Sequence, residues 1–234
     1  MTHAPKTPDR GPAMTRRRAM TVMGAATGLP WIGVADRSDT ALLRYQWDGT
    51  SLGSPSRLLL YHHDRATASR IVSECAAEIE RLERIFALYR TDSEITRLNR
   101  DGRIELPSLD LLAVLSRCQS LSALSRGAFD VTVQPLWTLY ASHFFGNAGP
   151  PPEGPALLAI ERTRRFVDWQ AINVGRRRIV LERAGMGVTL NGVAQGYITD
   201  HIMEILRANG CDRAFGNTGC SEISAIGRHA DGRP

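Results

Sequence analysis

Three segments of this 234-residue chain combine glycine and other small residues with isolated polar side chains, a mixture typical of ligand-binding loops. They cover residues 86–95, 127–136 and 188–200. In the third segment, a predicted strand leads through Asn191 and Gly192 into a predicted helix. The first turn of a helix has unpaired backbone N–H groups, and glycines let a phosphate approach them. Taken alone, the local pattern is more typical of an ordinary tight turn, and a phosphate-binding turn is the alternative.

Other motifs that mark common binding or catalytic sites are absent from the sequence. It contains no Gly-x-Gly-x-x-Gly, no phosphate-binding loop with a lysine, no Gly-x-Ser-x-Gly and no His-Glu-x-x-His. The four cysteines (Cys75, Cys118, Cys211 and Cys220) form no Cys-x-x-Cys pair and fit no zinc spacing. Cys75 and Cys118 lie on the apolar stripes of predicted helices, so we expect them to be buried thiols.

Taken together and in this order, the three segments resemble the FAD:protein FMN transferase family, also called the ApbE family. Tyr89 is followed by a Ser-x-x-x-x-x-Asn turn from Ser93 to Asn99, residues 127–136 read Gly-x-Phe-Asp-x-Thr-x-x-Pro-Leu, and residues 196–200 read Gly-Tyr-x-x-Asp. The resemblance covers about residues 42–227. It implies an α+β fold with a mixed or antiparallel sheet and flanking helices, an ApbE-like, T-fold-related domain.

The resemblance also implies which side chains contact FAD. Tyr89 matches the tyrosine that packs on the flavin, and Ala128, Phe129 and Asp130 match the segment that lines the FAD, with Asp130 placed for a polar contact. Each polar candidate has a structural alternative. Tyr89 could be a helix-end aromatic residue that covers the core, and Asp130 could cap a local turn.

Three further positions carry family roles by the same resemblance. Leu52 stands where the family has a methionine against FAD, and Gln195 stands where it has a lysine, glutamate or glutamine that touches the cofactor. Gly192 matches a position whose backbone carbonyl or side-chain oxygen is a ligand of Mg²⁺. Asp200, which ends the third motif, has the alternative of capping or bracing its helix.

The sequence departs from the family pattern at several places. Thr189 replaces an aspartate often found there, and residues 219–222 read Gly-Cys-Ser-Glu where many members have Gly-Gly-Asp. The family's His-x-x-Asp-Pro-x-Thr-Gly-like segment and its metal-binding Asp/Thr pair do not occur before Pro234. Because magnesium sites in proteins normally include one or two carboxylates, we expect an FAD:protein FMN transferase-like domain over residues 40–234 that is incomplete at its C-terminal end.

The activity implied by the family is attack of a protein Thr or Ser hydroxyl on the FAD pyrophosphate, which links FMN to the acceptor and releases AMP. FAD and Mg²⁺ are the expected cofactors, and an acceptor flavoprotein is the expected partner. The amino-acid sequence of residues 189–200 resembles that of the nitrous-oxide-reductase maturation (NosX-like) branch of the family. A membrane protein of nitrous-oxide respiration is therefore a candidate acceptor. The alternatives are a non-catalytic exported FAD-binding protein and a periplasmic assembly factor.

Apolar periodicity predicts the elements that position these segments. Strands are expected at residues 42–47, 58–61, 172, 178–181, 187–190, 213–215 and 222–226, with a turn at residues 48–50. Helices are expected at residues 65–88, 93–99, 108–125, 155–162 and 194–208, and a short one begins at residue 134. The helix over residues 108–125 is expected to bury Leu112, Leu115, Cys118 and Leu121 on one stripe.

The N-terminus carries most of the positive charge. Of the formal net charge of +5, residues 1–35 contribute five basic residues and one aspartate. Arg16 and Arg17, a mildly apolar run and a small-residue pattern ending at Ala35 predict a twin-arginine signal peptide over residues 1–35, hence a periplasmic protein. A disordered basic tail is the alternative. The remaining chain has no basic stripe, which argues against nucleic acid as a partner, and we expect at most peripheral membrane association.

Overall fold

A computed structural model describes residues 42–146, 153–219 and 222–227 of the chain. The helices are α2 (Arg65–Phe86), α3 (Glu94–Asp101), α4 (Leu109–Leu124), α5 (Gln134–Gly146), α6 (Leu157–Arg164) and α7 (Ala194–Ala208). The strands are β1 (Leu43–Ser51), β2 (Ser54–His62), β3 (Arg103–Glu105), β4 (Ile172–Val174), β5 (Arg178–Leu181), β6 (Ala214–Asn217) and β7 (Ile223–Ile226). Two short 3₁₀ turns are η1 (Val131–Val133) and η2 (Trp169–Ala171).

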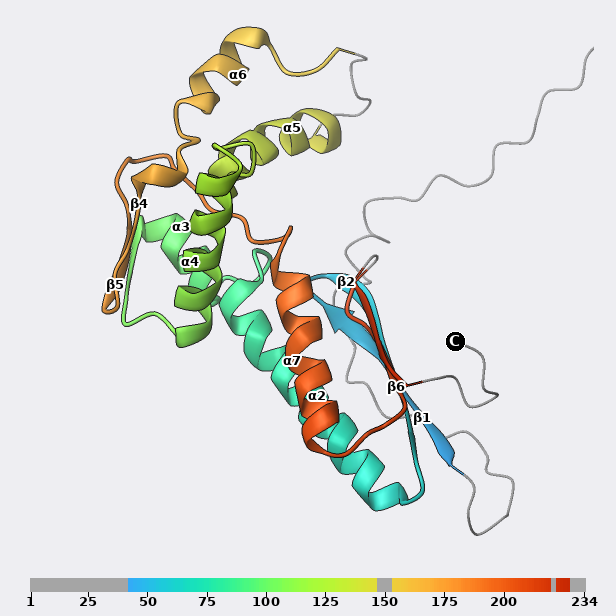
Figure 1. Cartoon of the computed structure of the whole chain (residues 1–234). Helices are drawn as coiled ribbons and strands as arrows, with labels where there is room; N and C mark the ends of the chain where they lie inside the picture. Colours follow the sequence, from blue (N-terminus) through green and yellow to red (C-terminus); the bar gives the residue numbers. More distant parts are fainter. Residues whose placement is uncertain (1–41, 147–152, 220–221, 228–234) are drawn as a thin grey trace, which may run out of the picture.

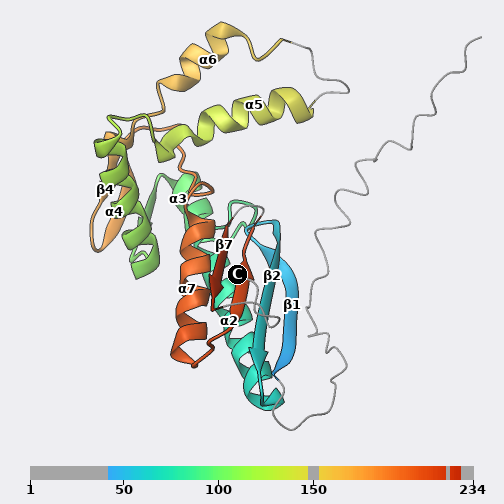
Figure 2. The same ribbon diagram turned by 45° about the vertical axis from the view of Figure 1, so that its right-hand side comes forward.

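One layer of the molecule is a four-stranded antiparallel sheet with the order β1-β2-β6-β7. Helices α2 and α7 run side by side and cover one face of this sheet (Figures 1 and 2). Strand β2 is central, because it pairs with β1 on one side and with β6, about 150 residues later in the sequence, on the other. After α7 the chain therefore returns to β2, and this pairing brings α7 close to the β1–β2 turn.

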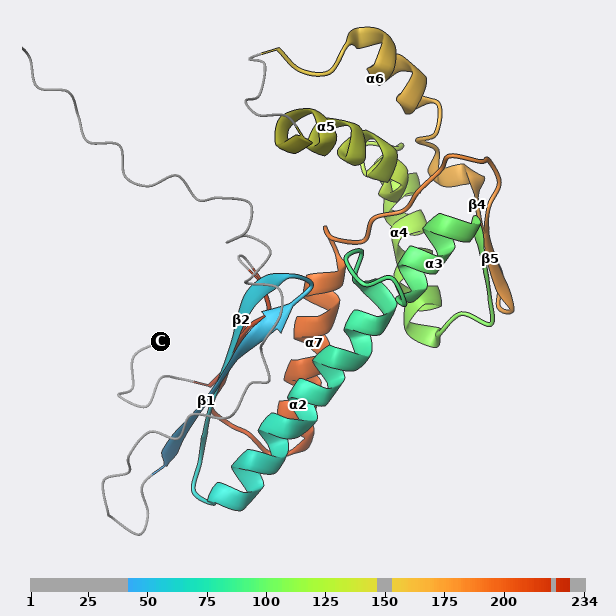
Figure 3. The same ribbon diagram turned by 180° about the vertical axis from the view of Figure 1, so that it is seen from behind.

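A second, smaller sheet lies at the other end of the molecule. Its order is β3-β5-β4, again antiparallel. Seen from behind, it stands beside α3 and α4, and the helices α5 and α6 extend from that end (Figure 3). The described strands pair only in antiparallel fashion, and helices flank both sheets, so the predicted α+β class is confirmed.

The β1–β2 hairpin turns later than predicted. Residues 48–50 belong to β1, and the connection is the two-residue turn of Leu52 and Gly53, with Ser51 paired to Ser54. Both turn residues have positive φ, 49° and 80°. Two-residue turns of this kind match the right-handed twist of the flanking strands. The predicted turn at residues 48–50 was wrong because pairing with β2 continues through Asp48-Gly49-Thr50.

The core is built largely on the apolar faces of α2, α4 and α7. The thiols of Cys75 and Cys118 are buried as predicted, and burial raises the pKa of the first to about 12 and of the second to about 11. Leu115 is buried on the expected α4 stripe, but Leu121 is 40% exposed. Leu121 instead lines a cavity of about 280 Å³ between α4 and α7.

Residues 187–190, predicted as a strand, join neither sheet. Val188 and Leu190 are buried, but the backbone of Val188 bonds to the side chain of Asn99, and the N–H of Thr189 bonds to the carbonyl of Val131. Within the described ranges, the hydrogen bonds of this segment go to the side chain of Asn99, to Val131 in η1 and to the residues that begin α7, instead of a neighbouring strand. The short strand β3 was missed, because only Ile104 in it is buried.

Other expectations concern residues outside the described ranges. The predicted signal peptide over residues 1–35, Cys220 and the chain end after residue 227 all lie there. Among the helices of the described ranges, none is both long and apolar enough to cross a membrane.

Candidate functional site

The β1–β2 turn meets the end of α2 at the first two candidate residues. The backbone N–H of Leu52 donates to Oε1 of Glu83 over 2.8 Å. A Cβ added to Gly53 would lie 3.6 Å from the ring of Tyr89, so the turn backbone faces that ring. Leu52 and Tyr89, 37 positions apart in the sequence, therefore lie at one place in the fold.

Tyr89 follows α2 in a turn, where its side chain is tied by its hydroxyl. The hydroxyl donates to Oε1 of Glu83 over 2.5 Å, and the residue is 48% exposed. Burial first, and then the hydrogen bond to Glu83, raise the pKa of Tyr89 well above its ordinary value. Tyr89 is thus no core-covering residue at a helix end: about half of it remains accessible to a ligand.

Gln195 reaches the same turn from the start of α7. Its side-chain Nε2 donates to Oγ of Ser54 over 3.2 Å, and Ser54 directly follows Gly53. Its backbone carbonyl accepts from Oγ1 of Thr199 (2.9 Å) and Oγ1 of Thr218 (3.2 Å). The fold thus gathers Leu52, Tyr89 and Gln195 around the β1–β2 turn, from three separate parts of the sequence.

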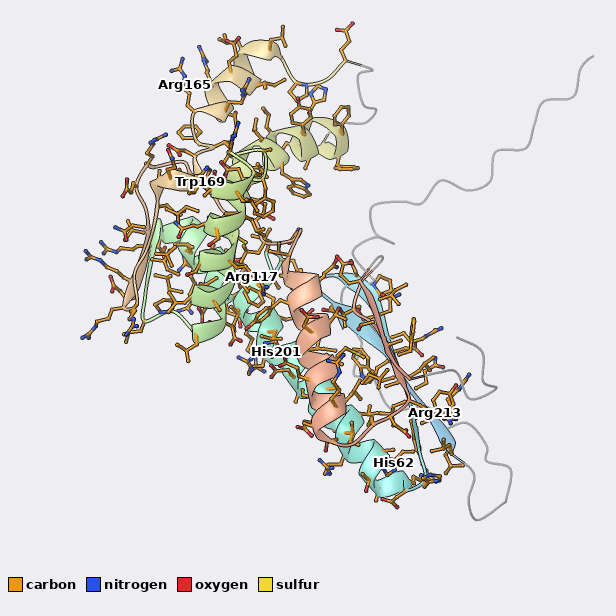
Figure 4. All side chains as sticks on the ribbon, viewed as in Figure 1. His62, Arg117, Arg165, Trp169, His201 and Arg213 are labelled. Carbon is orange, nitrogen blue, oxygen red and sulfur yellow. The ribbon has the colours of Figure 1, made fainter. Side chains whose placement is uncertain are left out.

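The segment of Ala128, Phe129 and Asp130 lies between α4 and η1. Asp130 caps η1: its Oδ1 accepts from the N–H of Thr132 (2.8 Å) and its Oδ2 from the N–H of Trp169 (3.1 Å). Both carboxylate oxygens thus already accept protein hydrogens, as in the turn-cap alternative. Phe129 packs partly against the core, and Ala128 is exposed. Trp169, labelled in Figure 4, marks this region between α4 and α6.

Residues 186–190 connect this segment to the Gly192 turn. Asn99 holds Val188 through two bonds, its Oδ1 accepting from the N–H (2.6 Å) and its Nδ2 donating to the carbonyl (2.8 Å). The N–H of Thr189 donates to the carbonyl of Val131 over 2.8 Å, one residue after Asp130. The backbone hydrogen bond from Thr189 to Val131 thereby joins the second and third sequence motifs. Asn99, which ends the Ser-x-x-x-x-x-Asn turn of the first motif, holds the third motif directly through Val188.

Gly192 lies in an exposed turn directly before α7. Within the described ranges, its carbonyl accepts no hydrogen bond from the protein, so it is free to face a cation. Those ranges contain no cluster of three or more His, Cys, Asp or Glu side chains that could hold a metal ion. A lone carbonyl does not make up a magnesium site, and we derive no chemical step through the metal.

Asp200 does not join the residues around the β1–β2 turn. It is exposed and lines the cavity between α4 and α7, together with Val193, Tyr197 and the exposed Arg117, which Figure 4 labels between these helices. Because Gln195 and Thr199 face the sheet, Asp200 lies on a different face of α7. The bracing alternative for Asp200 finds no support either, because no described residue forms a hydrogen bond with its side chain.

Sequence reasoning missed Glu83, Ser54 and Thr218, which hold the candidate residues in place. Glu83 carried a usable signal. It falls four residues after Ile79 and three before Phe86, on the apolar stripe of α2, and it is 7% exposed. A carboxylate on a buried stripe requires partners there. Ser54 and Thr218 carried no such signal, because their contacts depend on how β2 and β6 meet α7.

Comparison with known proteins points to one family. The model of the ApbE family matches residues 52–234. The chain is 28% identical over 178 residues to an FAD:protein FMN transferase of Klebsiella pneumoniae, a match that covers 75% of this chain and 54% of the relative. It is 26% identical over 176 residues to the enzyme of that name from Haemophilus influenzae, with 72% and 50% covered. The chain thus spans about half the length of these curated relatives.

Solved structures give the same fold. The flavin transferase ApbE of Vibrio cholerae superposes with a TM-score of 0.68 at 21% identity, covering 82% of this chain and 62% of that one. The flavinyl transferase ApbE of Pseudomonas stutzeri, in its apo form, gives 0.69 at 23% identity, with 85% and 62% covered. At these identities the likeness concerns the fold alone.

Proposed function

The chain belongs to the ApbE family, and from this premise we propose that its protein transfers the FMN moiety of FAD to a Thr or Ser of an acceptor protein and releases AMP. Similarity to FAD:protein FMN transferases supports the reaction. Because the chain spans about half of those relatives, the activity of the whole protein stays a proposal.

The observation that carries the proposal is the gathering of Leu52, Tyr89 and Gln195 around the β1–β2 turn. The ring of Tyr89 is about half exposed beside the backbone of Gly53. A half-exposed aromatic ring packed beside a glycine backbone offers a flat surface on which a planar ring system can stack. This favours the isoalloxazine ring of FAD as the group that binds there.

The reaction transfers the FMN group from the pyrophosphate of FAD, a phosphoanhydride, to an alcohol of the acceptor. The acceptor hydroxyl oxygen forms a bond to the phosphorus on the FMN side of the pyrophosphate, and the bond from that phosphorus to the bridging oxygen breaks. AMP leaves with the bridging oxygen, and the hydroxyl proton passes to a base and then to water. The part of the chain described here would bind and orient the flavin end, so that the pyrophosphate stands near the Gly192 turn at the start of α7.

Mg²⁺ is part of the proposal, because transfer between phosphates generally needs a cation to neutralise charge on the phosphates and leaving group. The carbonyl of Gly192 is the one group of the described residues that we assign to it. Substrate phosphates and water commonly complete a magnesium shell.

The site of action and the acceptor are also proposed. Arg16 and Arg17 precede a mildly apolar run, which supports export through the twin-arginine route to the periplasm. The amino-acid sequence of residues 189–200 favours a flavoprotein of nitrous-oxide respiration as the acceptor. Export is tested by replacing both arginines with lysine, which should leave the protein in the cytoplasm.

The reaction is tested by incubating the complete gene product with FAD, Mg²⁺ and a candidate acceptor. The expected result is an acceptor band that fluoresces as flavin in a denaturing gel and loses its signal when the acceptor Thr or Ser is replaced by Ala. EDTA should abolish labelling. FAD binding without labelling would support the non-catalytic FAD-binding alternative, and absence of FAD binding would leave the assembly factor.

A further inference from the structure

We propose that Glu83 is a positioning residue that fixes the ring of Tyr89 and the turn of Leu52 for contact with FAD. This inference rests on the proposed function, because it gives Glu83 a role only if these two residues meet the flavin. Glu83 lies in the last turn of α2, outside the three sequence motifs.

A single oxygen of Glu83 joins the two candidate residues. Oε1 accepts the N–H of Leu52 over 2.8 Å and the hydroxyl of Tyr89 over 2.5 Å. The donors come from the β1–β2 turn and from the segment after α2, so the carboxylate ties together two parts of the chain that also meet where Gly53 faces the ring of Tyr89. Each bond to a charged acceptor is stronger than a bond between neutral groups.

The burial of Glu83 argues for a specific task. It is 7% exposed, and within the described ranges no Arg or His forms an ion pair with it. The neighbouring Glu78 and Glu80, by contrast, are partly exposed and paired with arginines. Burying a carboxylate costs free energy that an apolar residue of similar size avoids. Packing alone therefore does not explain a glutamate at this position.

The two bonds hold a strained turn and an exposed ring together. Leu52 has a φ of 49°, a conformation that residues with a side chain seldom adopt. Gly53, with a φ of 80°, presents its backbone to the ring of Tyr89. Since Glu83 occupies the hydroxyl of Tyr89, the group left for a ligand is the ring. The ring would thus be set before FAD arrives, which lowers the ordering cost of binding.

The inference is tested by FAD affinity, measured as quenching of flavin fluorescence. Glu83→Ala should weaken FAD binding by about tenfold or more, the effect of losing a hydrogen bond to a charged group. Glu83→Gln should restore most of the affinity, because its amide oxygen can still accept. Glu74→Ala, an exposed change on the same helix, is the matched control and should leave the affinity unchanged.

A double-mutant cycle separates positioning from general structure. Tyr89→Phe removes the hydroxyl but keeps the ring, so in that background Glu83→Ala should cost clearly less than in the wild type. The remaining cost measures the bond to Leu52. An equal cost in both backgrounds would overturn the role of Glu83 toward Tyr89.

A second measurement needs no FAD. Tyrosine labelled with ¹³C at Cζ reports the ionisation of Tyr89 by NMR. Burial first, and then the hydrogen bond to the Glu83 carboxylate, raise the pKa of this phenol. Glu83→Gln should lower this pKa by the part that the carboxylate contributes, and an unchanged value would overturn the contact even if Glu83→Ala fails to fold. If wild-type protein binds FAD but Glu83→Ala binds it equally well, the positioning role fails while the proposed function stands. If wild-type protein does not bind FAD, the proposed function fails and the inference with it.

Discussion

At the scale of single residues, the side chain of Gln195 packs against the backbone of Gly219, which leaves no room for a Cβ at position 219. A Cβ added to Gly219 would lie 2.7 Å from the side-chain carbon of the Gln195 amide. This is closer than unbonded carbon atoms approach, so either the amide or the backbone must move. The close packing fixes the direction in which Gln195 points, towards Ser54.

Gly219→Ala is therefore expected to displace the amide of Gln195 and weaken FAD binding by roughly three- to tenfold, through strain of the order of 1 kcal/mol. The fluorescence titration of FAD measures this. Gly216→Ala is the control, because its Cβ would meet only the sulfur of Met203 at an ordinary 3.5 Å. Equal affinities for the two variants and the wild type would contradict a role for Gln195 at the site.

At the scale of elements, one side chain supplies the backbone hydrogen bonds that residues 187–190 would receive from a neighbouring strand. The side chain of Asn99, in α3, forms two hydrogen bonds with the backbone of the buried Val188. A neighbouring strand would form the same two bonds. This contact fixes residues 186–190, and through Thr189 and Val131 it also fixes the segment with Asp130. The geometry of the Gly192 turn therefore depends on α3.

Removing this contact should destabilise the fold. Asn99→Ala is expected to lower the free energy of unfolding by about 2–4 kcal/mol, because it deletes two hydrogen bonds and leaves the buried N–H and carbonyl of Val188 without a partner. Urea unfolding gives the change, and hydrogen exchange at the amide of Val188 should accelerate. Asn173→Ala, at an exposed position on β4, should change stability by less than about 0.5 kcal/mol.

A network of charges joins α2, α4 and α7. Arg81 bonds to Asp110 over 2.6 Å and to Glu78 over 2.7 Å, while Tyr197 donates to Asp110 over 2.8 Å and His201 lies 3.1 Å from Glu78. Figure 4 labels His201 on α7. Burial raises the pKa of Asp110, but the bonds from Arg81 and Tyr197 outweigh it and hold that pKa below its usual 3.8.

Since the folded pKa of Asp110 lies below its unfolded value, its contribution to stability is complete above about pH 4 and is lost as the pH falls through the folded pKa. We expect Arg81→Ala to lower stability at pH 7 by about 1 kcal/mol, a modest value because Arg81 is half exposed. The variant should also lose less stability than the wild type between pH 4 and pH 2. Chemical unfolding at several pH values measures both, with Arg100→Ala, in an exposed surface pair, as control. Parallel pH curves for wild type and Arg81→Ala would contradict the assignment.

At the scale of the whole molecule, the proposed flavin site joins elements that meet only in the folded chain. The β1–β2 turn, the end of α2, the start of α7 and the loop after β6 all contribute. A ligand bound across these elements stabilises the folded state over the unfolded state by mass action.

FAD at about one hundred times its Kd should accordingly stabilise the protein by about 2.7 kcal/mol, seen as a rise in Tm. The Tyr89→Ala variant should show a much smaller rise. A Tm that does not respond to FAD in the wild type would argue against binding across these elements.

The sequence alone predicted the α+β class, nearly every helix and most strands. Long apolar stripes, as in α2 and α7, repeat often enough to identify a helix, and serine caps such as Ser93 and Ser108 mark where helices begin. Resemblance to a family also indicated candidate flavin-contacting positions, which stay a prediction, but the sequence could not say which of them lie together.

The tertiary structure decided the rest. The β1–β2 turn moved from residues 48–50 to Leu52 and Gly53 because strand pairing, a contact between distant residues, sets where a hairpin ends. Residues 187–190 look like a strand by alternation, but their partner is the side chain of Asn99. The roles of Glu83 and Gln195 depend on bonds that span 31 and 141 positions in the sequence. Local pattern indicates most of the buried residues, although not Leu121, whereas only the packed chain fixes which buried and polar groups meet.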